Sequence, residues 1–144
     1  MPASVRYLLD SNILSEIPKD APSPLVLARL QKHWAICVTA STVLMELYFG
    51  AALLPPESKK YKRLIADYDA WFNHSQALTV LSFDAKAAHY AAFENARLQK
   101  LGKPRPWRDS QIAAVAATQN LILVTRNVAD FKPFKHLKIE NWFE

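Results

Sequence analysis

Four carboxylates occur at positions where folded proteins rarely place an unpaired charge. Asp10 directly follows the apolar run YLL, and Glu46 lies inside the apolar segment VLMELYFG. Asp109 stands at the start of a helical pattern, and Asp130 comes shortly after the apolar run LILVT. A buried carboxylate is costly unless it is paired, protonated or bound to a cation. The placement of these acids therefore indicates a site that holds positive charge.

Each acid taken alone also has an ordinary structural explanation. Asp10 and Asp109 could cap the helices that follow them, because a carboxylate accepts from the free amides of a first helical turn. Asp130 could serve in a turn. Glu46 could pair with one Lys or Arg, although a capping box is excluded because position 43 is Val. The interpretation as a site depends on all four lying together.

Alternating strand-like and helical segments predict how the acids are positioned. The strand-like runs are 5–9, 34–38, 78–81, 121–125 and, weakly, 137–142. The helical patterns cover a short piece over 13–17, then 23–33, 41–53, a segment around 61–72, 84–102 and 109–120. This alternation predicts one domain over 1–144, with a mostly parallel sheet covered by helices on both faces. Ligands collect at the carboxyl ends of strands in such folds, so the four acids can converge on one edge.

Converging carboxylates repel one another and raise one another's pKa values. A hard divalent cation such as Mg²⁺ or Mn²⁺ resolves that conflict, because it prefers carboxylate and water oxygens. The chain as a whole is basic, with 18 Lys and Arg against 13 Asp and Glu. An acidic metal site in a basic protein suits a phosphodiester substrate. On this view, removing one acid relieves repulsion, and the metal-free protein should keep or gain stability.

Other features limit the class of protein. Cys37 lies in the apolar stretch AICV and is expected to be a core thiol, and one cysteine allows no disulfide within a chain. No signal-peptide pattern and no apolar run near the roughly 20 residues of a membrane helix is found, which predicts a cytoplasmic protein without a membrane partner. The histidines show no metal-ligand spacing; they are His33, His74, His89 and His136.

Four short motifs resemble those of PIN-domain ribonucleases. LLDSNILSE resembles their first motif, Asp-Ser/Thr-Asn after an apolar strand, and ELYFG resembles Glu-Leu-x-x-Gly. DSQIAAVA resembles Asp-x-x-Ile-Ala-Ala, and TRNVADF resembles Thr-x-Asn-x-x-Asp-Phe. The motifs occur in the family's order, and the chain's length resembles the toxin component of VapBC-type toxin–antitoxin pairs. The resemblance implies a PIN-like three-layer α/β/α sandwich with a sheet of four or five strands.

The resemblance also implies roles for individual residues. Asp10, Glu46 and Asp109 match the family's metal-binding acids, and Asp130 matches a fourth, more distant acid. Polar residues that support the site are matched by Asn12, Thr125 and Asn127. The implied activity is endonucleolytic hydrolysis of RNA with Mg²⁺ or Mn²⁺, leaving a 5′-phosphate and a 3′-hydroxyl. The implied partners are an antitoxin protein, which covers the acidic cleft, and a second copy of the chain.

Two other functions stay open at this stage. A catalytically silent PIN-like module would bind nucleic acid without cleaving it, which the complete set of acids argues against. A phosphoacceptor receiver domain is also a small parallel α/β fold with acids at strand ends, and Asp84 follows the middle strand. That fold requires a lysine after a late strand, where this chain has Thr125 followed by Arg126. It also gives Glu46 no role.

A basic stretch precedes Asp109 and predicts a path for RNA. No acid occurs from 95 to 108, which contains Arg97, Lys100, Lys103, Arg105 and Arg108. Trp107 offers a surface on which a base can stack. The RNA-binding candidates are therefore Lys103, Arg105, Trp107 and Arg108, and a second basic cluster is Lys59, Lys60, Lys62 and Arg63. Either cluster could instead be an ordinary solvated face.

An amphipathic stripe marks the segment around 61–72. Its apolar side carries Tyr61, Leu64, Ile65, Tyr68 and Phe72. Helices of this pattern usually pack on the core of their own chain. So many aromatic rings on one stripe could also form an interface with a partner.

Overall fold

A parallel sheet forms the centre of the protein. The computed structural model describes residues 4–73 and 77–144, so His74 lies outside the described residues. The strands are β1 (Tyr7–Leu9), β2 (Cys37–Ala40), β3 (Thr79–Leu81), β4 (Ile122–Val124) and β5 (Lys138–Glu140). They form one five-stranded sheet in the order β3-β2-β1-β4-β5, and every neighbouring pair is parallel. The predicted α/β class with a mostly parallel sheet is confirmed.

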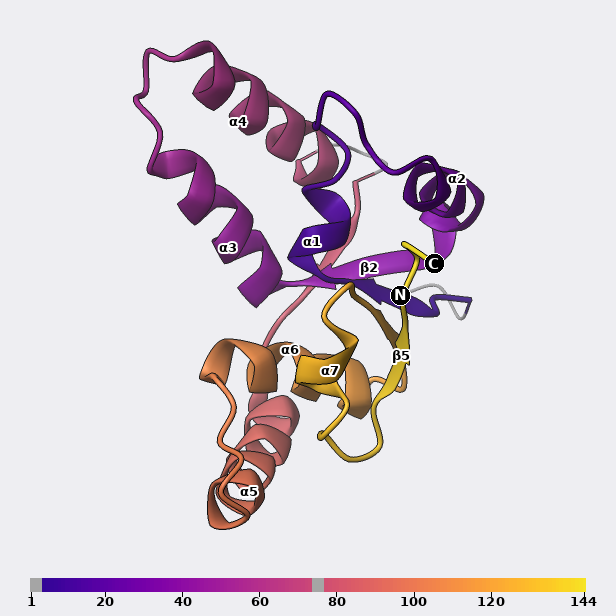
Figure 1. Cartoon of the computed structure of the whole chain (residues 1–144), viewed down its shortest axis with the longest axis vertical. Coiled ribbons are helices and arrows are strands. Elements are labelled where there is room, and N and C mark those ends of the chain that lie inside the picture. Colours follow the sequence, from indigo (N-terminus) through magenta and orange to yellow (C-terminus); the bar gives the residue numbers. More distant parts are fainter. Residues whose placement is uncertain (1–3, 74–76) are drawn as a thin grey trace.

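Helices cover the sheet on both sides (Figure 1). They are α1 (Ser11–Leu14), α2 (Pro24–His33), α3 (Ser41–Ala52), α4 (Lys59–Phe72), α5 (Ala85–Lys100), α6 (Trp107–Thr118) and α7 (Val128–Phe131). Figure 1 shows α3 and α4 on one side of the sheet, and α5, α6 and α7 on the other. The result is the three-layer α/β/α arrangement that the sequence predicted. No helix in the described part of the chain is long and apolar enough to cross a membrane.

The strand order bears on the receiver-domain alternative. Receiver domains have the doubly wound order 2-1-3-4-5, whereas this sheet has β2 and β4 on either side of β1. The chain first builds outward through β2 to β3 and then crosses back to add β4 on the other side of β1. The receiver-domain interpretation is therefore wrong.

Burial explains why β1 and β2 are mostly apolar. All of β1 and β2 is buried, as expected for strands that are covered by helices on both faces. The segment Trp34–Ile36, expected to begin the second strand, is a 3-10 turn instead, and β2 starts at Cys37. Cys37 is 5% exposed, and burial raises the pKa of its thiol to about 12. It is the core thiol that the sequence predicted.

Helix α3 is apolar nearly all round in sequence, but only part of its surface is buried. Val43 and Leu47 are buried, but Met45, Phe49 and Leu53 are 60%, 63% and 71% exposed. These three residues recur every four positions and so share one face of the helix. One apolar face of α3 therefore lies open to solvent, while the opposite face packs on the core.

Helix α4 packs its aromatic stripe inside the chain. Tyr68 is 4% exposed, and its ring centroid lies 5.5 Å from that of Tyr48 on α3. Tyr48 also contacts Phe72, with ring centroids 6.2 Å apart. The core explanation of this stripe holds, and its interpretation as a partner surface is wrong for Tyr68.

Arg97 belongs to the scaffold and is not a free cation of the basic stretch. Its guanidinium donates to both carboxylate oxygens of Glu94 at 2.8 and 2.9 Å and to the carbonyl of Pro133 at 2.8 Å. Glu94 also accepts from the backbone amide of Lys135 at 2.7 Å. These contacts tie α5 to the segment after α7.

We expect Glu94→Gln to destabilise the protein by about 2 kcal/mol, because it leaves the Arg97 guanidinium without its charged partner. The hydrogen bond from Arg97 holds the pKa of Glu94 below its ordinary value of 4.5. This contribution is therefore complete above pH 4.5 and is lost as the pH falls through the lowered pKa. Urea unfolding at pH 7 and pH 3 checks it, since the difference between variant and wild type should shrink at pH 3. A difference independent of pH contradicts the pairing.

Candidate functional site: an acidic cluster at the sheet's switch point

Three of the four predicted acids lie together at the point where the strand order changes direction, beside β1. Asp10 follows β1, the strand from which the sheet grows to β2 on one side and to β4 on the other. Thr125 follows β4, and the amide of Asp10 donates to the carbonyl of Val124 at 3.0 Å. In open α/β sheets, this point at the carboxyl ends of the strands is the usual place of a ligand.

Asp10 is completely buried and its two oxygens accept four hydrogen bonds. Oδ1 accepts from the amide of Ser11 at 2.7 Å, which begins α1, and from Arg108 Nη2 at 2.8 Å. Oδ2 accepts from Thr125 Oγ1 at 2.8 Å and from Asn12 Nδ2 at 3.3 Å. Asp10 thus caps α1 and also lies in the cluster, while its role as a metal ligand stays a prediction.

The predicted supporting residues contact the cluster in different ways. Asn12 also donates to Thr125 Oγ1 at 3.2 Å and accepts from the amide of Arg126 at 3.0 Å, which links the ends of β1 and β4. Asn127 contributes its backbone amide, which donates to Thr125 Oγ1 at 3.1 Å. Its side chain does not cap α7, and a supporting role of that side chain stays a prediction.

One guanidinium lies among three of the acids. Arg108 Nε donates to Glu46 Oε2 at 2.5 Å, Nη1 to Asp109 Oδ1 at 2.8 Å, and Nη2 to Asp10 Oδ1 at 2.8 Å. Nη2 also donates to the hydroxyl of Ser11 at 3.1 Å. The structure therefore brings together acids that come from the end of β1, from α3 and from α6.

Asp109 reaches this point because α6 begins earlier than the sequence suggested. The helix starts at Trp107 after Pro106, so Asp109 lies in its first turn and is not its cap. A proline sets a helix-compatible φ angle, and its missing amide is no loss at a helix start. Asp109 is 6% exposed, so the early start turns it inward beside Arg108.

A second arginine, Arg105, joins Asp130 to the cluster. Arg105 Nη2 lies 2.8 Å from Asp130 Oδ1 and 3.4 Å from Asp109 Oδ2. The Asp130 side chain is 49% exposed, against 0% for Asp10. Asp130 is therefore the outlying acid of the four, and its role in the site stays what the resemblance implies.

The acids keep the guanidinium of Arg108 firmly charged. Burial alone would lower the pKa of Arg108, but its hydrogen bonds to Glu46 and Asp109 and the charge of Asp10 outweigh burial and raise that pKa. Mutual repulsion of the acids is thus compensated inside the chain. Sequence reasoning placed Arg108 on an RNA path and missed this role; its position beside an acid at a helix start was the available signal.

The acids fit a divalent ion in chemical type. They offer carboxylate oxygens, the donors that Mg²⁺ and Mn²⁺ prefer, and Oε1 of Glu46 is buried without a hydrogen-bond partner. Among the residues that the structure describes, no three acidic, histidine or cysteine side chains lie close enough as they stand to hold one ion. The guanidinium of Arg108 stands between the acids.

The RNA-binding candidates separate into two pairs. Arg105 and Arg108 are engaged by the acids. Lys103 is exposed, and Trp107 is 73% exposed. The second pair is free to meet a ligand from solvent.

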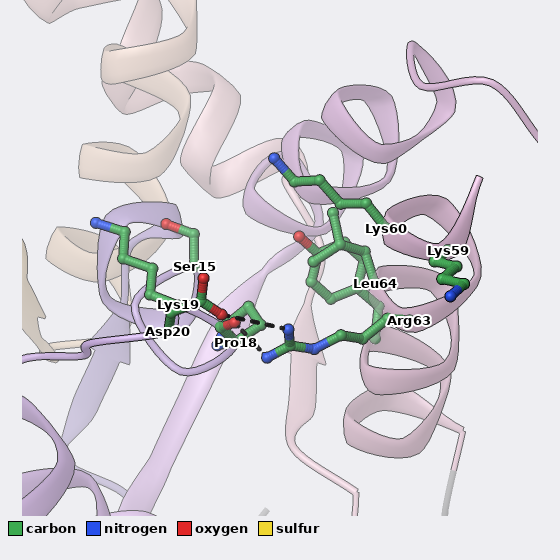
Figure 2. Close-up of a pocket in the computed structure, with 9 residues that line it drawn as sticks. Ser15, Pro18, Lys19, Asp20, Lys59, Lys60, Arg63 and Leu64 are labelled. Carbon is green, nitrogen blue, oxygen red and sulfur yellow. Dashed lines mark hydrogen bonds and ion pairs between the residues drawn. The ribbon is translucent and has the colours of Figure 1, made fainter.

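Lys59, Lys60 and Arg63 of the second basic cluster line a separate pocket of about 640 Å³ between α4 and the loop after α1 (Figure 2). Arg63 points across it to the loop, where it donates to the carbonyl of Pro18 at 2.5 Å. Lys59 and Lys60 are exposed at its wall. None of the four acids lines this pocket.

Comparison with known proteins decides the family. The model of the PIN domain matches residues 7–136. The chain belongs to the PIN-domain family. It is 35% identical over 140 residues to Ribonuclease VapC2 of Haemophilus influenzae, covering 96% of this chain and 98% of that protein. It is 30% identical to the tRNA(fMet)-specific endonuclease VapC of Shigella flexneri, with 96% and 98% covered. The chain is thus a PIN-domain protein of the VapC ribonuclease group.

Solved VapBC structures share the fold of this PIN domain. The DNA-bound VapBC of Salmonella typhimurium aligns with a TM-score of 0.80 at 27% identity, covering 96% of this chain and 98% of that one. VapBC2 of Rickettsia felis, bound to a promoter DNA fragment, aligns with a TM-score of 0.78 at 28% identity, covering 94% and 98%. The resemblance that the four motifs predicted is confirmed.

Proposed function

We propose that this PIN-domain protein is a Mg²⁺- or Mn²⁺-dependent endoribonuclease that acts as the toxin of a toxin–antitoxin pair. The observation that carries the proposal is the convergence of Asp10, Glu46 and Asp109 on one position that holds positive charge. The VapC relatives, named as a ribonuclease and as a tRNA endonuclease, support the substrate class.

The residues of the cluster have distinct roles in this proposal. Asp10 is a rigid ligand, because its oxygens are fixed by Ser11, Thr125 and Asn12. Glu46 and Asp109 supply further oxygens, and Asp130 acts from the rim. A divalent ion held there would lower the pKa of a bound water and offset charge on the phosphate. Attack by water leaves a 5′-phosphate and a 3′-hydroxyl and does not need the 2′-hydroxyl of RNA.

Sequencing of RNA ends after controlled expression tests the proposal. Wild type should produce new 5′-phosphate ends at defined sites, and Asp10→Asn should not. The purified protein should cleave single-stranded RNA in Mg²⁺ and stop in EDTA. RNA binding without new ends in either experiment would support the silent nucleic-acid-binding module instead.

The proposal includes an antitoxin partner and a cytoplasmic location. The two solved VapBC structures described above, of Salmonella typhimurium and Rickettsia felis, are both bound to DNA, and VapBC pairs are toxin–antitoxin pairs. Coverage of the acidic cluster by an antitoxin would keep RNA away from Asp10, which is how such a partner would silence cleavage.

We also propose a homodimer that buries the exposed face of α3, and expect Phe49→Glu/Leu53→Glu to make the protein monomeric. Both side chains are more than 60% exposed, and a glutamate pair facing its copy across a two-fold interface would repel. Light scattering measures the mass. Lys62→Glu/Lys86→Glu, which changes two exposed residues elsewhere, is the control. A dimer that persists in the α3 variant contradicts this surface.

We expect Lys103→Ala/Trp107→Ala to weaken RNA binding and to reduce its salt dependence. Each lost phosphate contact lowers the slope of log affinity against log salt by about 0.7 for single strands, and the lost ring removes a stacking partner. Binding is measured in Ca²⁺, so that substrate is not consumed. Lys59→Ala/Lys60→Ala is the matched control at the separate pocket. If only the control loses affinity, RNA reaches the protein at that pocket.

A further inference from the structure

Arg108 has no role in the proposed chemistry, yet it makes more contacts with the acids than any other side chain of the cluster. Its three nitrogens each donate to a different carboxylate, and the side chain is 28% exposed. A planar guanidinium with a fixed fork of donors suits this arrangement, which the point charge of a lysine would not reproduce.

The guanidinium and a divalent ion need the same oxygens. Arg108 engages Asp10 Oδ1, Glu46 Oε2 and Asp109 Oδ1. Mg²⁺ binds its oxygen ligands at about 2.0–2.1 Å, much closer than a hydrogen-bonding nitrogen allows, and its charge repels a guanidinium among the same acids. The guanidinium and the divalent ion therefore cannot both bind these three carboxylates at the same time.

We propose that Arg108 is an internal counter-cation that occupies the acidic cluster in the metal-free protein and must leave before a divalent ion binds. It keeps three acids from β1, α3 and α6 together while no ion is present. Metal loading is therefore an exchange of one cation for another. This inference rests on the proposed function in one respect, that a divalent ion binds these acids.

The competition has a measurable consequence. A site that is open only part of the time shows an affinity reduced by the fraction of time it is open. Removing the internal cation should therefore tighten metal binding. The metal-free protein should at the same time become less stable, because the three acids then face one another without compensation.

Isothermal titration calorimetry with Mn²⁺, in the absence of RNA, measures the metal affinity and tests the proposal. Arg108→Gln should bind Mn²⁺ at least about tenfold more tightly than wild type, and Arg108→Lys should lie between them. Arg63→Gln removes one positive charge at the separate pocket and should leave the affinity unchanged, which controls for net charge. Asp10→Asn should bind Mn²⁺ weakly or not at all.

The outcomes separate this inference from the proposed function. Equal or weaker binding by Arg108→Gln, while wild type binds and Asp10→Asn does not, overturns the role of Arg108 alone. No Mn²⁺ binding by any of the proteins overturns the metal site, and with it both proposals.

Nuclear magnetic resonance of the wild-type protein gives a second measurement that does not depend on a variant folding. In arginine labelled with ¹⁵N, the Nε–H signal of Arg108 should shift or broaden as Mg²⁺ is added, because its bond to Glu46 is broken. The Nε–H signal of Arg97, bonded to Glu94, should stay in place. An Arg108 signal that does not change at saturating Mg²⁺ overturns the exchange.

Discussion

Asp10→Asn is expected to lower the rate of RNA cleavage by a hundredfold or more, a loss on the order of that seen when a site loses one preorganised electrostatic group. Asp10 is the acid held most rigidly, because four donors fix its two oxygens at the end of β1. An asparagine keeps the shape and loses the negative charge that a cation requires. Initial cleavage rates of purified proteins in saturating Mg²⁺ measure the effect, and full activity of the variant contradicts the role of Asp10.

The same variant should also be less stable than wild type without metal, by about 3 kcal/mol. The expectation from sequence was the opposite, since removal of one of four repelling acids should cost nothing. In the structure, Arg108 and Thr125 donate hydrogen bonds to the Asp10 carboxylate. The side-chain amide of Asn at this position would place its own N–H donors against these donors. Urea unfolding in EDTA measures this. Asp20→Asn, at a fully exposed acid, is the control, and an Asp10→Asn protein as stable as wild type contradicts the argument.

The fold was predictable because its signals are local. Short apolar runs flanked by helical patterns specify buried parallel strands, and Ser and Asp residues mark helix starts, as Ser23, Ser58 and Asp84 do for α2, α4 and α5. The start of α6 was misplaced because Pro106, which lacks a capping side chain, stands where Asp109 was expected to cap. The open face of α3 could not be predicted, because apolar composition does not distinguish a buried face from one that is exposed in the single chain.

The acids of the candidate site were predictable, and their counter-charges were not. A carboxylate at a strand end or inside an apolar helix is unusual in itself, so Asp10 and Glu46 could be identified from their neighbours in sequence. The partner of an arginine depends on which residues the fold brings within about 3 Å, and this proximity cannot be read from the sequence. Arg108 meets Glu46 across 62 positions and Asp10 across 98. The basic stretch before Asp109 was therefore interpreted as a free surface, although its two innermost arginines are engaged by acids.

Glu46→Gln is expected to remove most of the cleavage activity, by a factor on the order of a hundred, with little change in stability. Glu46 lies on α3 with its side chain 28% exposed, and only its Oε2 accepts a hydrogen bond, from Arg108 Nε. The amide oxygen of a glutamine can still accept that bond, so folding loses little, whereas the charge needed to hold a cation is gone.

Comparison of this variant with Asp10→Asn separates catalysis from folding within one cluster. Cleavage rates and urea unfolding in EDTA are measured on both, with Glu57→Gln, an exposed acid before α4, as the control. We expect both cluster variants to be inactive and only Asp10→Asn to be destabilised, because Asp10 accepts four hydrogen bonds and Glu46 accepts one. Full activity of Glu46→Gln would exclude Glu46 from the metal site. Equal destabilisation of the two variants would show that Arg108 holds both acids alike, and that the contacts of Asp10 with Thr125 and Asn12 add nothing to folding.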